Sequence, residues 1–124
     1  MIKILVADDN EQITESLSKL LKDYDVTLAH DGKSALDIAA SWKPDLVLLD
    51  VAMPVMSGIE VLGKLMAMPR RPLVIMLTGD ESVETVSKAM GIGVFSYITK
   101  PLDADLLLDQ VRKAAEFLNK SSAA

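Results

Sequence analysis

The sequence contains no cysteine and a single histidine, His30. Disulfides, thiolate zinc sites and cysteine nucleophiles are therefore excluded, and so is a metal centre built from several histidines. Arginine is also scarce, and acidic residues outnumber basic ones by 18 to 13, which gives a formal net charge of −5. A chain of this kind lacks the basic surface of a nucleic-acid-binding domain, so we expect no direct contact with nucleic acid.

Long hydrophobic runs are missing as well. Half of the residues are hydrophobic, yet no run approaches the roughly 18 residues that a membrane-spanning helix needs. A length of 124 residues suits one domain, and a chain of this size buries about two thirds of its surface around a single core. The sequence therefore predicts a cytoplasmic domain over residues 1–118 with no contact to membranes. Residues 119–124 are predicted to form a polar tail or the start of a linker.

Two alternating patterns predict the secondary structure. Five short apolar segments predict strands at residues 2–7, 25–29, 45–49, 73–77 and 94–98. Three of them are continuously apolar, which is typical of parallel strands covered on both faces. Apolar residues at helical spacing follow each strand. Ser57 with Glu60 three residues later predicts a helix N-terminus, and Gly91 is the expected C-cap of the next helix.

This strand–helix order, repeated five times, predicts a doubly wound α/β fold with a parallel sheet and helices on both of its faces. In such sheets ligands bind beyond the carboxyl ends of the strands. The residues that directly follow each strand are therefore the candidates for chemistry.

Acidic residues, a hydroxyl and a lysine stand at these strand ends. Asp8 and Asp9 follow the first strand and Asp50 follows the third. Three carboxylates at one edge repel one another unless they bind a cation, and an all-oxygen ligand set suits Mg²⁺. Thr78 and Lys100 follow the fourth and fifth strands. The cation, Lys100 and Thr78 would hold phosphoryl oxygens and leave one aspartate as the nucleophile of an aspartyl phosphate.

Each of these residues alone has an ordinary structural explanation. Asp8, Asp9 and Asn10 could be caps and first-turn acids of the helix that follows. Thr78 could be a common strand residue, and Lys100 could be a solvated side chain before a loop proline. Their placement together at the ends of the first, third, fourth and fifth strands favours a shared site.

Five segments carry a family resemblance. They are ILVADDN at 4–10, PDLVLLD at 44–50, MPVMSG at 53–58, LTG at 77–79 and YITKP at 97–101. Over essentially the whole chain the sequence resembles the receiver domain of bacterial two-component response regulators, of the chemotaxis type. The resemblance implies a flavodoxin-like (βα)₅ fold with strand order 2-1-3-4-5. It also implies a signalling phosphoacceptor rather than an enzyme, with a histidine kinase or phosphotransfer protein as donor and a downstream effector as partner.

The resemblance also implies a ligand set. Asp50 resembles the phosphoacceptor, and Asp8 and Asp9 resemble the acidic pair that serves Mg²⁺, with Mn²⁺ as a possible substitute. The backbone carbonyl of Ala52 resembles the remaining protein ligand to that metal.

Other residues resemble the switch of the family. Thr78 resembles the hydroxyl that moves toward the phosphoryl group, and Lys100 the lysine that pairs with it. The Lys100–Pro101 bond would be cis. Tyr97 resembles the aromatic residue that turns inward on activation, and the fourth helix, fifth strand and fifth helix would form the output face.

Two departures from the family pattern concern output and phosphorylation lifetime. Phe95 and Ser96 stand where receivers that dimerise to drive DNA-binding domains carry acidic residues, so we do not expect that salt-bridged dimer. Ala52 and Asp80 stand at the two positions that contact the attacking water during dephosphorylation, and Ala52 offers that water no polar side chain.

Two other functions use part of the same residue pattern. A haloacid-dehalogenase-like phosphohydrolase needs a second aspartate two residues after the nucleophile as general acid, and Ala52 occupies that position. A flavodoxin-like flavin-binding module needs a first loop that cradles a phosphate, whereas this loop begins with Asp8 and Asp9 and would repel one.

Overall fold

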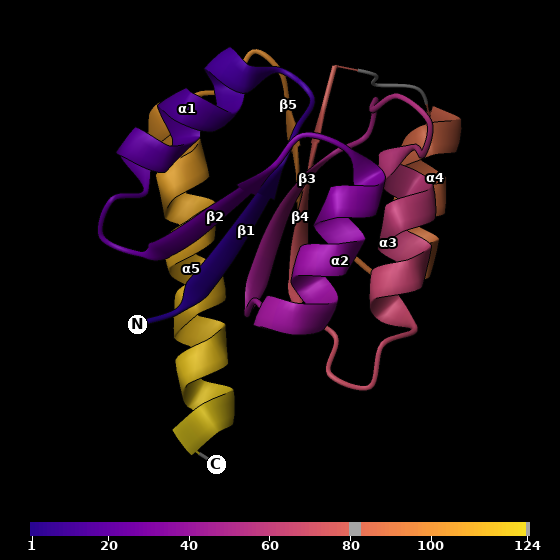
Figure 1. Cartoon of the computed structure of the whole chain (residues 1–124). Coiled ribbons are helices and arrows are strands. Elements are labelled where there is room, and N and C mark those ends of the chain that lie inside the picture. The colour runs from indigo at the N-terminus through magenta and orange to yellow at the C-terminus, as the bar shows by residue number, and fades with distance from the viewer. Residues whose placement is uncertain (80–82, 124) are drawn as a thin grey trace.

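Five parallel strands form one sheet at the centre of the molecule (Figure 1). The computed structural model describes residues 1–79 and 83–123. The strands are β1 (Lys3–Ala7), β2 (Asp25–Ala29), β3 (Leu46–Asp50), β4 (Leu73–Thr78) and β5 (Ser96–Thr99). The helices are α1 (Glu11–Leu20), α2 (Gly32–Trp42), α3 (Gly58–Met66), α4 (Val83–Ile92) and α5 (Ala104–Ala123). The strand order is β2-β1-β3-β4-β5, which confirms the predicted flavodoxin-like topology.

The continuous apolarity of the strands follows from helices on both faces of the sheet. All five residues of β3 are buried. Leu46 and Leu48 pack on one face, with α1 and α5, while Val47 and Leu49 pack on the other, with α2, α3 and α4. Figure 1 shows the same division, with α1 and α5 on one side of the sheet and α2, α3 and α4 on the other. Because successive strand side chains point to opposite faces, both faces need apolar residues.

The structure confirms one predicted helix end and corrects another. Ser57 is the N-cap of α3 and accepts a hydrogen bond from the backbone N–H of Glu60 at 3.3 Å. The prediction of Gly91 as the C-cap of α4 is wrong, because α4 continues to Ile92. Gly93 has a φ of 120° and donates its N–H to the Ala89 carbonyl at 3.0 Å. A residue just past a helix end takes positive φ most easily when it is glycine.

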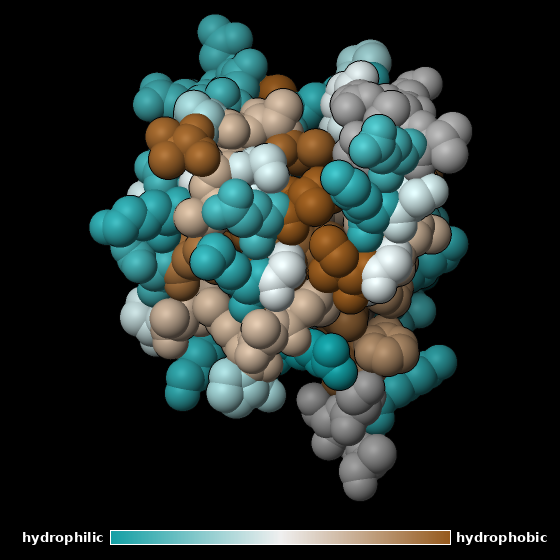
Figure 2. Space-filling model, turned by 90° about the vertical axis from the view of Figure 1, so that its right-hand side faces the viewer, coloured by the Kyte–Doolittle hydropathy of each residue, from teal (hydrophilic) through white to brown (hydrophobic). Residues whose placement is uncertain are grey.

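The face formed by α3 and α4 carries an apolar strip between hydrophilic side chains (Figure 2). On α4, Met90 and Ile92 are exposed to 61% and 38%. At the other side of the molecule, α5 continues to Ala123, so residues 119–123 extend the last helix. The domain limit at residue 118 stays a prediction. In the described part of the chain no helix is long and apolar enough to cross a membrane.

Candidate functional site

The sheet register brings the predicted site residues to one edge. Leu49 of β3 lies beside Ala7 of β1, so Asp50 and Asp8 come next to each other at the ends of these strands. Thr78 ends β4 and is paired with Thr99 of β5. Because parallel strands end at the same edge, residues up to 92 positions apart in sequence meet there.

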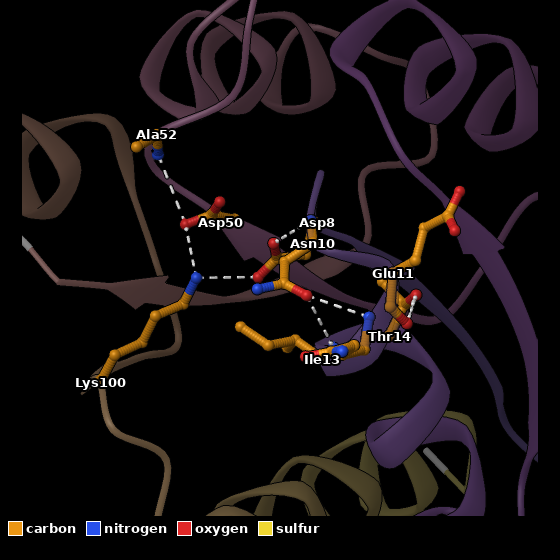
Figure 3. A network of polar contacts seen from close by, with 9 residues as sticks. Asp8, Asn10, Glu11, Ile13, Thr14, Asp50, Ala52 and Lys100 are labelled. Carbon is orange, nitrogen blue, oxygen red and sulfur yellow. Dashed lines mark hydrogen bonds and ion pairs between the residues drawn. The ribbon is translucent and has the colours of Figure 1, made fainter.

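A single ammonium group joins the two buried carboxylates. Lys100 Nζ lies 2.9 Å from Asp8 Oδ2 and 3.2 Å from Asp50 Oδ1, and Figure 3 shows both carboxylates directed at it. Asp8 is fully buried and Asp50 is 2% exposed. Buried charges need hydrogen-bonded partners, and here one cation serves two anions.

The N-cap residue of α1 holds the carboxylate oxygen of Asp8 that Lys100 does not contact. The backbone N–H of Asn10 donates to Asp8 Oδ1 at 2.9 Å. The Asn10 side chain in turn caps α1, because its Oδ1 accepts from the N–H groups of Gln12 at 3.0 Å and Ile13 at 3.3 Å (Figure 3). From the sequence alone, Asn10 is only a possible helix cap. The structure makes this cap part of the support of the site.

The loop after β3 shapes the surroundings of Asp50. The backbone N–H of Ala52 donates to Asp50 Oδ1 at 3.4 Å. The N–H of Gly58, the first residue of α3, donates to the Val51 carbonyl at 2.7 Å. The loop therefore leaves the sheet and returns to the residue directly after Asp50. In the sequence, Gly58 stands out only as the last residue of the MPVMSG segment.

Burial changes the acidity of these groups. Desolvation, reinforced by the neighbouring Asp8 charge, raises the pKa of Asp50 to about 6, although Lys100 acts in the opposite direction. Burial also opposes the charge of Lys100. The hydrogen bond to Asp8 and the charge of Asp50 outweigh it, so the pKa of Lys100 lies above its ordinary value. The pocket therefore holds more negative charge than its lysine balances.

Three carboxylates are arranged as a metal site. Asp8, Asp9 and Asp50 each offer an oxygen, and these oxygens lie within 4.8 Å of one another. Asp9 is exposed, so the cluster is open to water on one side. With Lys100 included, the formal charge of the set is −3 + 1 = −2. This hard, oxygen-only and negatively charged set fits Mg²⁺, which keeps some of its waters when bound.

The remaining predicted residues lie beside this cluster. Thr78 is fully buried, and its backbone carbonyl accepts a hydrogen bond from the Lys100 N–H at 2.6 Å. The Lys100–Pro101 bond is cis, as the resemblance implied. Tyr97 lies on β5 opposite Met76 and packs partly buried against the core. In the sheet register it lies two residues before Thr99, the last residue of β5. Asp80 lies outside the described residues.

Replacing Asp50 by asparagine is expected to stabilise the metal-free protein at neutral pH. A buried carboxyl with a raised pKa binds its proton more tightly when folded, so its ionisation destabilises the fold above the unfolded value of 3.8. Asp50→Asn should therefore raise the free energy of unfolding by about 2 kcal/mol near pH 8. The gain should shrink from about pH 6 downward and vanish near 3.8. Urea denaturation in the presence of a chelator at both ends of this range measures it. An equal gain at every pH would contradict the assigned pKa.

Comparison with known proteins finds a matching family and several relatives of this chain. The model of the response regulator receiver domain family matches residues 4–112. The chain is 35% identical over 116 residues to the regulatory protein AtoC of Escherichia coli K12, covering 92% of this chain and 25% of AtoC. It is 38% identical over 113 residues to the response regulator MprA of Mycobacterium tuberculosis H37Rv, covering 90% of this chain and 49% of MprA. The chain thus spans half or less of either relative.

Solved structures resemble the fold over nearly its full length. The receiver domain protein (CheY-like) of Methanospirillum hungatei JF-1 superposes with a TM-score of 0.93 at 28% identity, covering 98% of both chains. The BeF3-activated DrrB receiver domain superposes with a TM-score of 0.86 at 31% identity, covering 94% of this chain and 98% of that one.

Proposed function

The chain belongs to the family of response regulator receiver domains, and on this premise we propose that Asp50 accepts a phosphoryl group from a phosphohistidine. The donor is a histidine kinase or a phosphotransfer protein. The observation that carries the proposal is the buried Asp50 carboxylate, held 3.2 Å from Lys100 Nζ beside a second buried carboxylate. A carboxylate that can serve as nucleophile, a cation for the developing charge and a second acid that can bind a metal thus lie within contact distance of one another.

The transfer breaks one bond and forms one. An Asp50 oxygen attacks phosphorus, an O–P bond forms, and the N–P bond of the phosphohistidine breaks, with its electron pair going to the imidazole. Asp8, Asp9, Asp50 and the Ala52 carbonyl would hold Mg²⁺, which would supply positive charge for the phosphoryl oxygens. Lys100 pairs with one of these oxygens. Positioning and charge neutralisation are what phosphoryl transfer requires of a protein.

Acetyl phosphate with Mg²⁺ tests this function directly. We expect intact-protein mass spectrometry to show the addition of one phosphoryl group. This addition should not occur when Mg²⁺ is chelated from the start, nor in Asp50→Asn. The asparagine variant keeps the shape of the side chain but lacks the nucleophilic oxygen pair. An unmodified mass under conditions that label a control receiver would count against the proposal. So would labelling that persists in Asp50→Asn.

The Thr78 hydroxyl is proposed to couple phosphorylation to the output face. Thr78 ends β4 in a fully buried position, next to the strand that carries Tyr97. Thr78→Ala should still accept a phosphoryl group from acetyl phosphate, but should weaken the response of a partner that reads α4, β5 and α5. Amide chemical shifts in β5 and α5, compared before and after phosphorylation, measure the coupling within the domain. Shift changes as large as those of the unaltered chain would show that Thr78 plays no such part.

A groove beside the pocket suits the phosphodonor protein. It has a volume of about 440 Å³ and lies between α1 and the start of α5. Its apolar lining includes Ile13, Leu17, Leu20 and Leu102. Lys100 lines this groove and also contacts Asp50. A helix of the donor that packs into the groove would therefore bring its phosphohistidine toward Asp50.

The wider role follows from the relatives. MprA is a response regulator about twice as long as the matched region. We propose that phosphorylation of this domain, in the cytoplasm, signals to a downstream effector protein or effector domain. The domain itself acts as a phosphoacceptor rather than as an enzyme, and it makes no direct contact with nucleic acid or membrane.

A further inference from the structure

The loop between β3 and α3 is held at its base and on its inner side. The Gly58 N–H bonds to the Val51 carbonyl at 2.7 Å and closes the base. Met53 is buried, and Met56 packs partly buried against the core cluster on the α2–α3–α4 face. The loop lies beyond the carboxyl end of β3 (Figure 1). Val55 lies midway in the chain between the closed ends at Val51 and Gly58, which puts it at the middle of the loop.

The backbone at Val55 is strained. Val55 has a φ of 69°, and the Met56 N–H donates to the Pro54 carbonyl at 2.7 Å. A hydrogen bond over three residues with positive φ at the centre defines a γ-turn of the rarer, strained hand. Positive φ is least favourable for β-branched side chains, because the Cβ substituents crowd the backbone.

The side chain of Val55 gains no burial within its own fold that would offset this strain. It is 105% exposed, and it is the most exposed of the large apolar residues in the described part of the chain. Glycine or asparagine would form the same turn with less strain. A strained residue whose side chain packs on nothing within the molecule is best explained by a contact with another molecule.

The position of Val55 indicates which molecule this is. The loop begins at the residue after Asp50, on the α2–α3–α4 side of the sheet. The apolar groove near Lys100 lies on the α1–α5 side. A protein that delivers a phosphoryl group to Asp50 must cover the edge between these two sides, whereas a small donor reaches the pocket without touching either.

We propose that Val55 is a specificity-determining contact for the protein that carries the phosphohistidine, and that this partner presents an apolar patch to it. The inference rests on the proposed function of Asp50. It adds a second contact, across the pocket from the groove. The strained turn holds the valine outward in one position, which lowers the entropy lost when the partner binds.

The experiment compares a protein donor with a small one. The protein donor is an autophosphorylated histidine kinase core from the source organism, namely the core that transfers fastest to the unaltered chain. The small donor is acetyl phosphate. Val55→Asn removes the apolar side chain but tolerates positive φ, so its melting temperature should equal or exceed that of the unaltered chain. Its phosphotransfer rate from the kinase core should fall about tenfold, while its rate from acetyl phosphate stays unchanged.

Two further variants complete the design. Val55→Ile keeps an apolar β-branched side chain and should restore transfer from the kinase core. Met90→Gln removes another exposed apolar side chain, 61% exposed on α4, and should change neither rate.

Each outcome decides between distinct conclusions. Equal transfer from the kinase core to Val55→Asn and to the unaltered chain would overturn the contact. An equal fall with both donors would also overturn it, because the substitution would then act on Asp50 itself. If acetyl phosphate labels the unaltered chain but no kinase core does, the contact is overturned and the chemistry of the pocket stands. If neither donor labels the unaltered chain, the proposed function itself fails.

Discussion

Replacing Lys100 by methionine is expected to lower the rate of phosphorylation by acetyl phosphate at least about a hundredfold. Lys100 is the cation that contacts both buried carboxylates, at 2.9 and 3.2 Å. Methionine fills a similar volume but leaves the phosphoryl oxygens without their protein cation. Time courses of labelling by intact mass at saturating Mg²⁺ measure the rate. A rate within a few fold of the unaltered chain would show that Mg²⁺ alone neutralises the transferred group.

The same substitution should destabilise the metal-free protein in a pH-dependent way. Without Lys100, the folded-state pKa of Asp50 rises further above about 6, so the folded state binds its proton still more tightly. The loss of stability should be about 3 kcal/mol near pH 8. The part that comes from Asp50 should shrink as the pH falls through its folded-state pKa and should disappear below about 3.8, where Asp50 is protonated in both the folded and the unfolded protein. Urea denaturation in a chelator measures both limits. Addition of Mg²⁺ near pH 8 should return part of the loss.

A surface lysine provides the control for Lys100→Met. Lys88 pairs with Glu84 at 3.8 Å along α4, with both side chains more than 60% exposed. Lys88→Met should change the free energy of unfolding by less than about 0.5 kcal/mol and leave the labelling rate intact. If both variants lost equal stability, the loss at Lys100 could not be assigned to the buried carboxylates.

The fold was predictable because its main signal is local. Continuous apolar runs separated by helical spacing fix a parallel sheet with two covered faces. The predicted strand limits were less accurate than the order of the strands. Apolar burial and backbone pairing do not begin or end at the same residue. Val94 is apolar and packs on the core, yet β5 begins only at Ser96, where pairing with Ile75 starts. Asp50 is polar but still pairs with Leu77, so β3 includes it.

The candidate site was predictable to the level of residue types at strand ends. Topology alone brings the ends of β1, β3 and β5 together, and so Asp8, Asp50 and Lys100 meet. The supports of the site were not predictable, because they depend on backbone positions in space. No local pattern shows that the Asn10 N–H holds Asp8, or that α3 begins in contact with the backbone of Asp50.

That contact makes Gly58 the most restrictive small residue of the site. A Cβ placed on Gly58 would lie 2.1 Å from the Asp50 carbonyl oxygen and 2.7 Å from the Val51 Cα. Both are backbone atoms, so no side-chain rotation relieves the clash. Gly58→Ala must therefore push α3 away from β3 or move the peptide that carries the phosphoacceptor.

The matched control lies in the same helix. A Cβ on Gly63 of α3 would meet nothing within 4 Å, so Gly63→Ala should raise the free energy of unfolding by about 0.5–1 kcal/mol through helix propensity alone. Gly58→Ala should lower it by about 3 kcal/mol, the upper range for overpacking.

The folded fraction of Gly58→Ala should also take up phosphoryl groups from acetyl phosphate at least about tenfold more slowly, since small displacements of reacting groups have large effects on rate. Urea denaturation and intact-mass time courses, run on both glycine variants, separate the two effects. Equal stability of Gly58→Ala and Gly63→Ala would contradict the close approach of α3 to Asp50. Lowered stability with an unchanged labelling rate would mean that α3 moves and Asp50 does not. If stability and labelling rate both fall, the start of α3 is one of the elements that set the position of the phosphoacceptor.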